Sequence, residues 1–348
     1  MTVRRKLIVL CLMFEFVLAL LGVATTTVSI DFKCPICGNK GKALAIMSSN
    51  NFGGLDRDLL QRPVGDHPLS IVPIVCTKCY FAGTEQDFKK PGQIDPALKK
   101  QILAGKKLVP AIPIKRGMTS NQVPPWVKWD LICQLHQLKH GDDERLGDLE
   151  LAAAWSVRVS RRYYELLGDD LMKSLQEWGA KEVKVPPSVE NGNRADLEIK
   201  EAHRLLGSID SADATSAPLV GLTALILFCD HGENLDAENV LQRLRPLLSV
   251  QLFAKLDTFV RESTAIETRF QERAIECYER ILGNETDEGK RAVHLYLLGE
   301  LYRRTRKWDV AIAYFDRALK TKALNTLLTG WADQQKELTL RQSTAAGK

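Results

Sequence analysis

The spacing of apolar residues changes character along the chain. From Trp126 onward, apolar positions recur every three or four residues, which is the pattern of helices with one buried face. Before that point, short apolar runs at 43–47 and 70–75 are bounded by Gly, Asn and Pro, as short strands are. The sequence therefore predicts an α+β protein, with a small β-rich domain over residues 30–90 and an all-α region over residues 126–338.

The helical region divides at turn residues. Pro186-Pro187 and Asn191-Gly192-Asn193 mark one break, and residues 339–348 are expected to form a disordered tail. Helices are predicted over 126–139, 146–167, 169–179, 194–207, 217–231, 235–246, 251–283, 288–304, 308–321 and 323–338.

One helical stretch has a more specific pattern, which resembles a tetratricopeptide repeat. Its small residues, Gly299 and Ala311, would let two helices approach closely, and its large residues would fill the space between them. Since such repeats cannot bury their faces alone, we expect at least three units to stack into a solenoid. The matching positions are Leu295, Leu298, Gly299, Tyr302, Ala311, Phe315 and Ala318.

The N-terminal domain contains four cysteines in two pairs, Cys34-Pro-Ile-Cys37 and Cys76-Thr-Lys-Cys79. Two Cys-x-x-Cys turns can supply the four thiolates that tetrahedral zinc prefers. The separation of 38 residues between the pairs exceeds that of compact sites, so a loop must be inserted. We therefore predict a zinc ribbon with a structural Zn²⁺. Two disulfides are the alternative in an oxidising compartment, and a thioredoxin-type redox pair fits the predicted hairpins poorly.

These residues resemble the bacterial family called domain of unknown function 2225. Its pattern is a Cys-Pro-x-Cys pair, a central Asp-x-Asp, an Asn-Pro and a Cys-Pro-x-Cys-Gly-Tyr-Ala pair, and a tetratricopeptide-like segment usually follows. This chain has His67 in place of the Asn, Thr77 in place of the Pro, and Tyr80 in place of the Gly after the second pair. The resemblance covers residues 32–90 well, and it implies no known reaction.

Asp56, Asp58 and His67 are the polar cluster near the predicted metal site. We expect them to be turn residues whose side chains cap the backbone. Alternatively, they bind the metal, support its ligands, or form the site of an enzyme of unknown reaction. A second candidate group, Cys133 and His136 with His140, shares one face of a predicted helix. We expect Cys133, like Cys229 and Cys277, to be a small buried side chain and no ligand.

Residues 91–125 are expected to form a basic, proline-containing linker. Between residues 89 and 125 eight basic residues stand against one acid, Asp95, and Asp95-Pro96 predicts the start of a short helix. The linker could be a solvated connector, or it could contact anionic surfaces such as phospholipid, cell-wall polymer or nucleic acid.

Residues 1–24 have the pattern of a secretory signal peptide. Arg4, Arg5 and Lys6 precede an apolar stretch at 7–21, and small residues end the segment at Ala24. The sequence thus predicts an exported protein, periplasmic or extracellular. The alternative is an uncleaved anchor at residues 7–24, which would be the chain's only contact with a membrane.

Together these features predict an exported zinc-binding protein that binds protein or peptide partners through its helical repeats. A formal charge of +5, of which residues 1–24 contribute +2, makes nucleic acid an unlikely partner. A nucleic-acid-binding zinc ribbon remains the alternative if the protein is cytosolic. The sequence shows no phosphate-binding Gly-rich loop, Gly-x-Ser-x-Gly or His-Glu-x-x-His motif, so we expect a binding protein rather than an enzyme.

Overall fold

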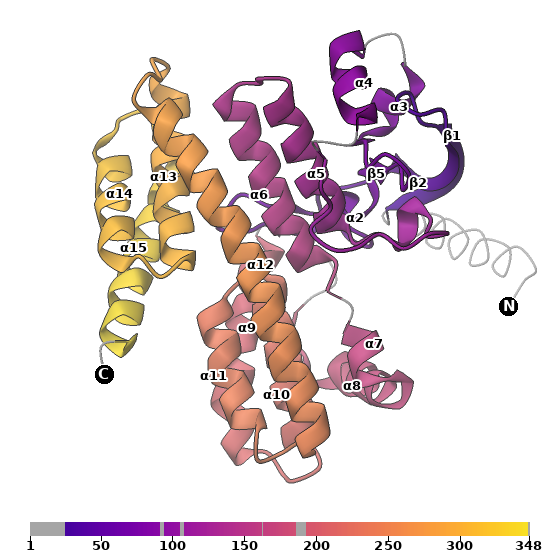
Figure 1. Ribbon diagram of the computed structural model, residues 1–348. Helices are drawn as coiled ribbons and strands as arrows, with labels where there is room; N and C mark the ends of the chain where they lie inside the picture. The colour runs from indigo at the N-terminus through magenta and orange to yellow at the C-terminus, as the bar shows by residue number, and fades with distance from the viewer. Residues whose placement is uncertain (1–24, 91–93, 105–107, 162, 186–192, 347–348) are drawn as a thin grey trace, which may run out of the picture.

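The computed structural model describes residues 25–90, 94–104, 108–161, 163–185 and 193–346. It confirms the predicted fold class, because a small β region carrying the cysteines is followed by a mostly helical region (Figure 1). The predicted signal segment, residues 1–24, lies outside the described residues. Within the part of the chain that is described, no helix is both long and apolar enough to span a membrane.

The β region is built on one antiparallel hairpin. Strand β1 (Thr26–Lys33) pairs with β2 (Lys40–Ser48), and Phe32 lies opposite Gly41. A side-chain carbon at Gly41 would lie 2.6 Å from the Phe32 ring, so the glycine makes room for the aromatic ring. The apolar run at 43–47 correctly predicts β2, whereas β1 has no apolar run to reveal it.

Two minimal ladders complete the strands. β3 (Gly54–Leu55) pairs with β4 (Gln61–Arg62), and β5 (Ile74–Val75) pairs with β6 (Ala82–Gly83). The predicted strand at 70–75 is wrong in its first half, because residues Pro68–Ile71 form the helical turn α2. His67 caps that turn and Pro68 occupies its first position, where proline needs no hydrogen-bond partner.

The predicted linker is part of the N-terminal core. Helix α3 (Glu85–Lys89) is followed by α4 (Pro96–Leu103), which Asp95 caps as the sequence predicts. Leu98 and Ile102 of α4, together with Leu108 and Val123, are buried in the same cluster as the cysteines. The expectation of a solvated connector is therefore wrong for the described residues, because Leu98 and Ile102, four positions apart on one face of α4, reach the core together with later apolar residues of the segment.

The helical region follows the predicted periodicity closely. One predicted helix, 146–167, is in fact two, since α6 ends at Val159 and α7 begins at Tyr163. The tail prediction is also wrong for residues 339–346, which continue the last helix. The helices are α5 (Pro125–Leu138), α6 (Asp143–Val159), α7 (Tyr163–Leu167), α8 (Asp169–Glu182), α9 (Arg194–Ser208), α10 (Ala217–Asp230), α11 (Asn234–Leu244), α12 (Val250–Leu282), α13 (Glu288–Arg304), α14 (Trp308–Lys320) and α15 (Thr326–Ala346).

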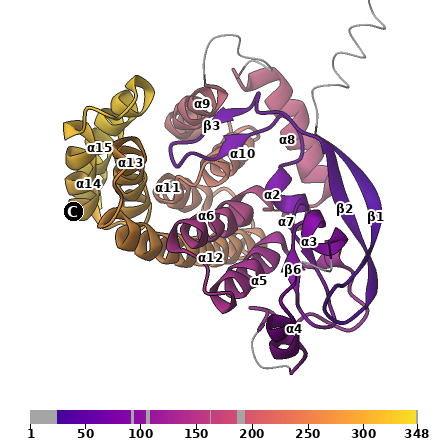
Figure 2. The same cartoon turned by 90° about the horizontal axis from the view of Figure 1, so that it is seen from above.

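The 33-residue helix α12 connects the helical groups. Its first half packs with α9, α10 and α11, its second half leads to α13, α14 and α15, and α6 packs along it (Figure 1). The alanines of α6 let the two helices approach closely, and both Ala153 and Ala154 are fully buried. Figure 2 shows that β3, from the N-terminal region, lies beside α9 rather than beside the β1–β2 hairpin.

The α13–α14 pair has the close contact that the sequence pattern predicts. Gly299, Ala311 and Phe315 are all buried, and a side-chain carbon at Gly299 would lie 2.7 Å from the Phe315 ring. The helices therefore meet where the glycine removes a side chain. The assignment of this pair as a tetratricopeptide repeat stays a prediction.

A pair of glycine substitutions tests this contact. Gly299→Ala is expected to lower the free energy of unfolding by about 1–3 kcal/mol, because its methyl group overpacks against Phe315. Gly330→Ala, in α15 with open space around it, should instead raise that free energy by up to about 1 kcal/mol through helix propensity. Chemical denaturation of both variants measures the difference, and shifts of the same sign would contradict the contact.

Candidate metal centre and buried charged junction

The two Cys-x-x-Cys segments form the same turn. The backbone N–H of Gly38 donates to the carbonyl of Cys34 at 2.9 Å, and that of Tyr80 donates to the carbonyl of Cys76 at 2.8 Å. Gly38 and Tyr80 both have left-handed backbones, with φ of 73° and 62°. Tyr80 adopts the conformation that favours glycine, and its ring packs against the N-terminal core. The departure from the family pattern at Tyr80 therefore leaves the shape of the turn unchanged.

The turns bring all four sulfurs together. The Sγ atoms of Cys34 and Cys79 lie 3.6 Å apart, those of Cys37 and Cys76 lie 3.5 Å apart, and all four lie within 4.8 Å of one another. A disulfide needs about 2.05 Å between sulfurs, and these are free thiols. Thiolates at about 2.3 Å from one tetrahedral Zn²⁺ would stand about 3.8 Å apart. The spacing therefore fits a shared metal ion.

The thiols also depend on one another electrostatically. Hydrogen bonds from Cys34 and Cys79 lower the pKa of Cys76 to about 2, and the same contact with Cys76 raises the pKa of Cys34 to about 12. The four sulfurs therefore lie close enough for the charge on one to depend on the others. Cys34 and Cys76 are buried, whereas Cys37 and Cys79 are half-buried. A divalent cation bound by all four would compensate the charge and leave no coordination position open to substrate.

His67 has different hydrogen-bond partners from Asp56 and Asp58. Its Nδ1 accepts from the N–H of Leu69 at 3.1 Å, and its Nε2 lies 3.0 Å from the carbonyl oxygen of Gln61. Because Nδ1 accepts, Nε2 carries the proton and the ring is neutral. Burial lowers the pKa of His67 to about 4, in keeping with that form. The predicted capping role of His67 is confirmed.

Asp56 and Asp58 lie in the turn between β3 and β4, and both are buried, with 1% and 0% of their surface exposed. Neither carboxylate faces the cysteines. The adjoining Leu55 and Leu59 pack against the core of α13, α14 and α15, whereas the cysteines belong to the N-terminal core. Carboxylates buried in this way are closed to substrate, which counts against a catalytic site in this turn.

Arg158 of α6 is the partner of both carboxylates. Its guanidinium lies 2.7 Å from an oxygen of Asp58, 3.2 Å from Asp56 and 2.6 Å from Glu267 of α12. All three side chains that bind it are buried, so the charges are compensated without water. Neighbouring Arg158 keeps the pKa of Asp58 below its usual range despite the opposing effect of burial.

The turn between β3 and β4 is bound by side chains of the helical region, which contact both its backbone and its side chains. The Asn193 side chain accepts from the N–H of Leu55 at 2.9 Å and donates to its carbonyl at 2.6 Å. Tyr296 donates to the carbonyl of Arg57 at 2.7 Å, and the guanidinium of Arg57 lies 4.3 Å from the ring centre of Trp331. Helices far apart in the sequence thus hold one short segment of the N-terminal region.

His231, at the end of α10, bridges two acids. Its Nδ1 lies 2.7 Å from Asp56 and its Nε2 lies 2.9 Å from Glu198 of α9. Burial disfavours the charged ring, but the two carboxylates outweigh that effect and raise the pKa of His231. Both partners are carboxylate oxygens, which accept, so an imidazolium with a proton on each nitrogen is the form that would satisfy both contacts. No sequence pattern marks His231, because its partners Asp56 and Glu198 lie 175 and 33 positions away along the chain.

A second group of ion pairs adjoins the first. Arg304 of α13 contacts Glu300 at 2.7 Å and Asp58 at 3.8 Å, and Arg303 contacts Glu233 at 2.9 Å. We call these connected side chains the buried junction. Its members are Asp56, Asp58, Arg62, Arg158, His231, Glu233, Glu267, Glu300, Arg303 and Arg304.

The sequence carries one usable sign of this junction. Arg158 and Glu267 occupy the buried faces of otherwise apolar helices, and a charged residue on such a face requires a partner. Which partner it finds depends on contacts between residues about 100 positions apart, such as Arg158 with Asp58. Periodicity within one helix contains no information about such pairs.

The group Cys133, His136 and His140 is not a ligand set. Cys133 is buried, His136 Nε2 lies 2.9 Å from the carbonyl of Asp142, and His140 is exposed. Cys229 and Cys277 are buried free thiols as predicted. Among the described residues, the four cysteines of the two turns are the group that could hold a metal ion.

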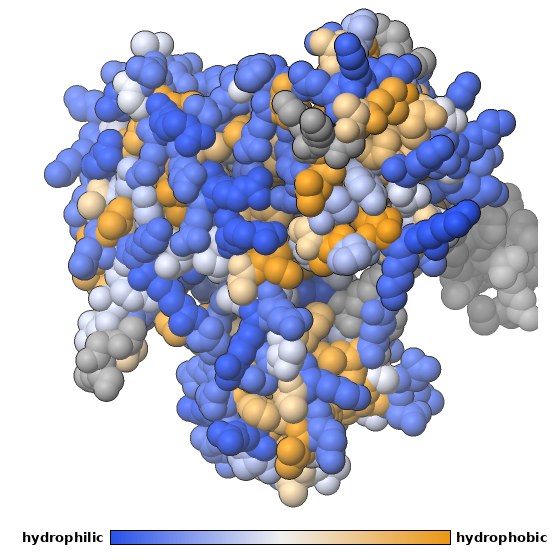
Figure 3. Space-filling model, viewed as in Figure 1, coloured by the Kyte–Doolittle hydropathy of each residue, from blue (hydrophilic) through white to orange (hydrophobic). Residues whose placement is uncertain are grey.

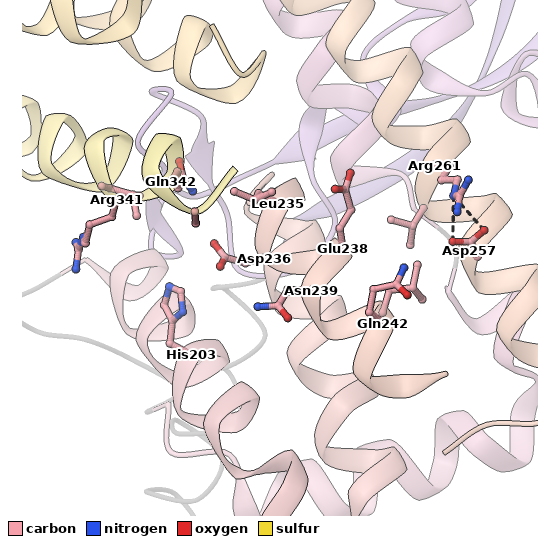
Figure 4. A pocket seen from close by; sticks show the side chains of 14 residues that line it. His203, Leu235, Asp236, Glu238, Asn239, Gln242, Asp257, Arg261, Arg341 and Gln342 are labelled. Carbon is pink, nitrogen blue, oxygen red and sulfur yellow. Dashed lines mark hydrogen bonds and ion pairs between the residues drawn. The ribbon is translucent and has the colours of Figure 1, made fainter. Parts of the chain in front are cut away.

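The helical region also has an open groove, which Figure 4 shows from close by. It has a volume of about 1040 Å³ and lies between α9, α11, α12 and the end of α15. Asp236 points into it, and burial and the neighbouring Glu233 raise the pKa of Asp236 to about 6. Its lining includes His203, Leu235, Asp236, Glu238, Asn239, Gln242, Asp257, Val260, Arg261, Leu338, Arg341 and Gln342.

The two histidines predict opposite pH effects on stability. A raised folded pKa means that His231 stabilises the fold below about pH 6.5, and that this contribution is lost as pH rises through the folded value. His67, whose folded pKa is about 4, acts oppositely, because its contribution is present above about pH 6.5 and is lost as pH falls toward 4.

Denaturation of two variants across pH separates these effects. Three charged groups face the His231 ring, namely Asp56, Glu198 and the nearby Arg62. The His231→Gln variant should therefore lose less stability than the wild type as the pH rises into the alkaline range. His67→Asn, which keeps a capping side chain, should remove part of the loss on the acidic side. The same pH profile for the wild type and His231→Gln would contradict a charged His231.

Comparison with known proteins agrees with the cysteine pattern. No curated protein and no solved structure matches the chain. The matched region of one family model contains the hairpin, both cysteine turns, Asp56 and Asp58, and also Arg158, which binds the two carboxylates. Residues 28–162 of this chain match the family described as "Uncharacterized protein conserved in bacteria (DUF2225)".

Proposed function

We propose that this chain is an exported zinc-binding protein that acts as a protein-interaction or scaffold module through its helical region. Zinc has a structural role at Cys34, Cys37, Cys76 and Cys79. The convergence of these four sulfurs within 4.8 Å is the observation that carries the metal part of the proposal. The groove beside Asp236 supports the interaction part.

The N-terminal region has a clear need for a metal. Its strands other than β1 and β2 are two residues long, and ladders this short are unstable alone. A structural Zn²⁺ can contribute about 10–16 kcal/mol to the folding of a small domain at neutral pH. The two turns are far apart in sequence, so one ion would connect the β1–β2 hairpin with the β5–β6 ladder.

The groove suits a peptide with a basic side chain. Glu238 and Asp257, on its wall, already pair with Arg306 and Arg261. Among the described residues, Asp236 has no ion-pair partner, and its raised pKa shows that an ionised carboxylate there lacks compensation. A lysine or arginine of a partner would supply it, while Leu235, Val260 and Leu338 offer apolar contact.

Export is proposed from sequence alone. The basic residues, apolar stretch and small residues of 1–24 support a cleaved signal peptide, with an uncleaved anchor at 7–24 as the alternative. A zinc ion on all four cysteines would also protect them from oxidation outside the cytoplasm, because it occupies the thiolates that disulfide exchange requires.

Metal analysis tests the zinc site. The purified chain should contain about one zinc, and Cys76→Ser should lose it together with the protection of β1 and β2 from hydrogen exchange. Chelation of the wild type should have the same effect. The matched control is Cys277→Ala, which changes a buried cysteine outside the cluster and should keep the zinc. A folded chain that lacks zinc and has four oxidised cysteines would refute the site.

Photo-crosslinking tests the groove. A photoreactive residue at Asn239, which is exposed on the groove wall, should form one dominant protein adduct in producing cells. Asp236→Arg should abolish that adduct because it repels the basic side chain of the partner. Asp333→Arg, which places the same charge on exposed α15 outside the groove, should leave it intact. The same photoreactive residue is also placed at Lys173, which is exposed on α8 outside the groove. An adduct there as strong as the one at Asn239 would contradict specific binding in the groove.

A further inference from the structure

The surface formed by α4 and residues 108–118 carries both exposed apolar side chains and exposed basic side chains. The inner face of α4 is buried through Leu98 and Ile102, and its outer face exposes Lys99 and Lys100. Residues 108–118 then continue over the same core. We call this the α4 surface, and in Figure 3 apolar side chains gather beside α4 among hydrophilic ones.

Its exposed apolar side chains are held in place by the fold. Leu103, the last residue of α4, is 53% exposed, and Val109 is 67% exposed. The side chain of Gln134 in α5 binds both backbone groups of Val109, accepting from its N–H and donating to its carbonyl, each at 2.9 Å. The valine side chain therefore points into solvent because a rigid helix fixes its backbone. Exposed apolar groups on a fixed scaffold indicate a contact surface.

The segments that carry these side chains are strongly basic. Residues 25–125 contain 14 lysines and arginines against 7 acids, whereas residues 126–348 contain 31 against 35. The exposed Lys99, Lys100, Lys115 and Arg116 have no ion-pair partner among the described residues. The positive charge of the whole chain therefore belongs to its N-terminal region, and the described part of the α4 surface contains no ion pair that involves these four basic side chains.

We propose that the α4 surface binds anionic phospholipid bilayers. Leu103 and Val109 enter the headgroup layer, and the surrounding lysines and Arg116 meet lipid phosphates, which is the pattern of a peripheral membrane contact. Nucleic acid is the less favoured ligand, because residues 89–125 contain no Phe, Tyr or Trp on which a base could stack. This contact is separate from the proposed groove and from any anchoring by residues 7–24.

Vesicle sedimentation of the full chain tests the proposal. Vesicles of phosphatidylcholine alone are compared with vesicles that also contain phosphatidylglycerol. Residues 1–24 have a net charge of +2 and are present in every variant, so the contribution of the α4 surface is the difference between each variant and the wild type. The wild type should prefer the anionic vesicles at least tenfold, and added salt should reduce the preference. Lys99→Glu with Lys100→Glu should reduce this preference several-fold, and Leu103→Ser with Val109→Ser should weaken binding to the anionic vesicles about tenfold.

Matched substitutions elsewhere separate the α4 surface from general effects. Lys173→Glu with Lys181→Glu changes two exposed lysines of α8, and Val250→Ser changes an 80% exposed valine. These variants should bind as the wild type does, and zinc content and circular dichroism show that every variant is folded. Equal binding to both vesicles, unchanged binding of the α4 variants, or tighter binding to a single-stranded oligonucleotide than to anionic vesicles would each overturn the proposal.

Discussion

The structure depends on a buried guanidinium. Each of the three nitrogens of Arg158 contacts a carboxylate, and these carboxylates come from the turn that carries Asp56 and Asp58 and from Glu267 on α12. None of these groups reaches water. Removing one partner from such a set costs about 3–5 kcal/mol, because the remaining charge stays buried without compensation. The ions therefore define one arrangement of α6, α12 and the turn.

This arrangement changes the relation between the two regions of the chain. The sequence suggests a metal-binding domain followed by a separate helical solenoid. Instead, the loop inserted between the two cysteine pairs lies among α6, α9, α12, α13 and α15, where Asn193 and Tyr296 bind its backbone. The length of that insertion has a structural reason, since it must reach from the cysteine cluster to the helices. The inner face of the helical region is thus filled by the protein's own segment.

Two different interactions fix this inserted segment, one at its ends and one in its middle. The cysteine turns on either side of it converge on one cluster of sulfurs, and the ion pairs hold its middle. Surfaces that stay open lie outside both: the groove at Asp236, between α11 and the end of α15, and the α4 surface with its lysines. Neither surface includes the cysteines or Arg158, and the groove adjoins the buried junction through Gln342, which accepts a hydrogen bond from Arg303.

By itself, the sequence determined the local features. Helical periodicity placed most helices within a few residues, Asp95-Pro96 marked the start of α4, and the cysteine spacing identified the possible metal site. These features depend on residues close together in the chain or on one rigid turn. Only the tertiary structure decided that Asp56 and Asp58 bind Arg158, that His231 lies between two carboxylates, and that the basic segment joins the core. The first two outcomes depend on contacts between residues 100 and 175 positions apart, and the third depends on a core to which other elements contribute.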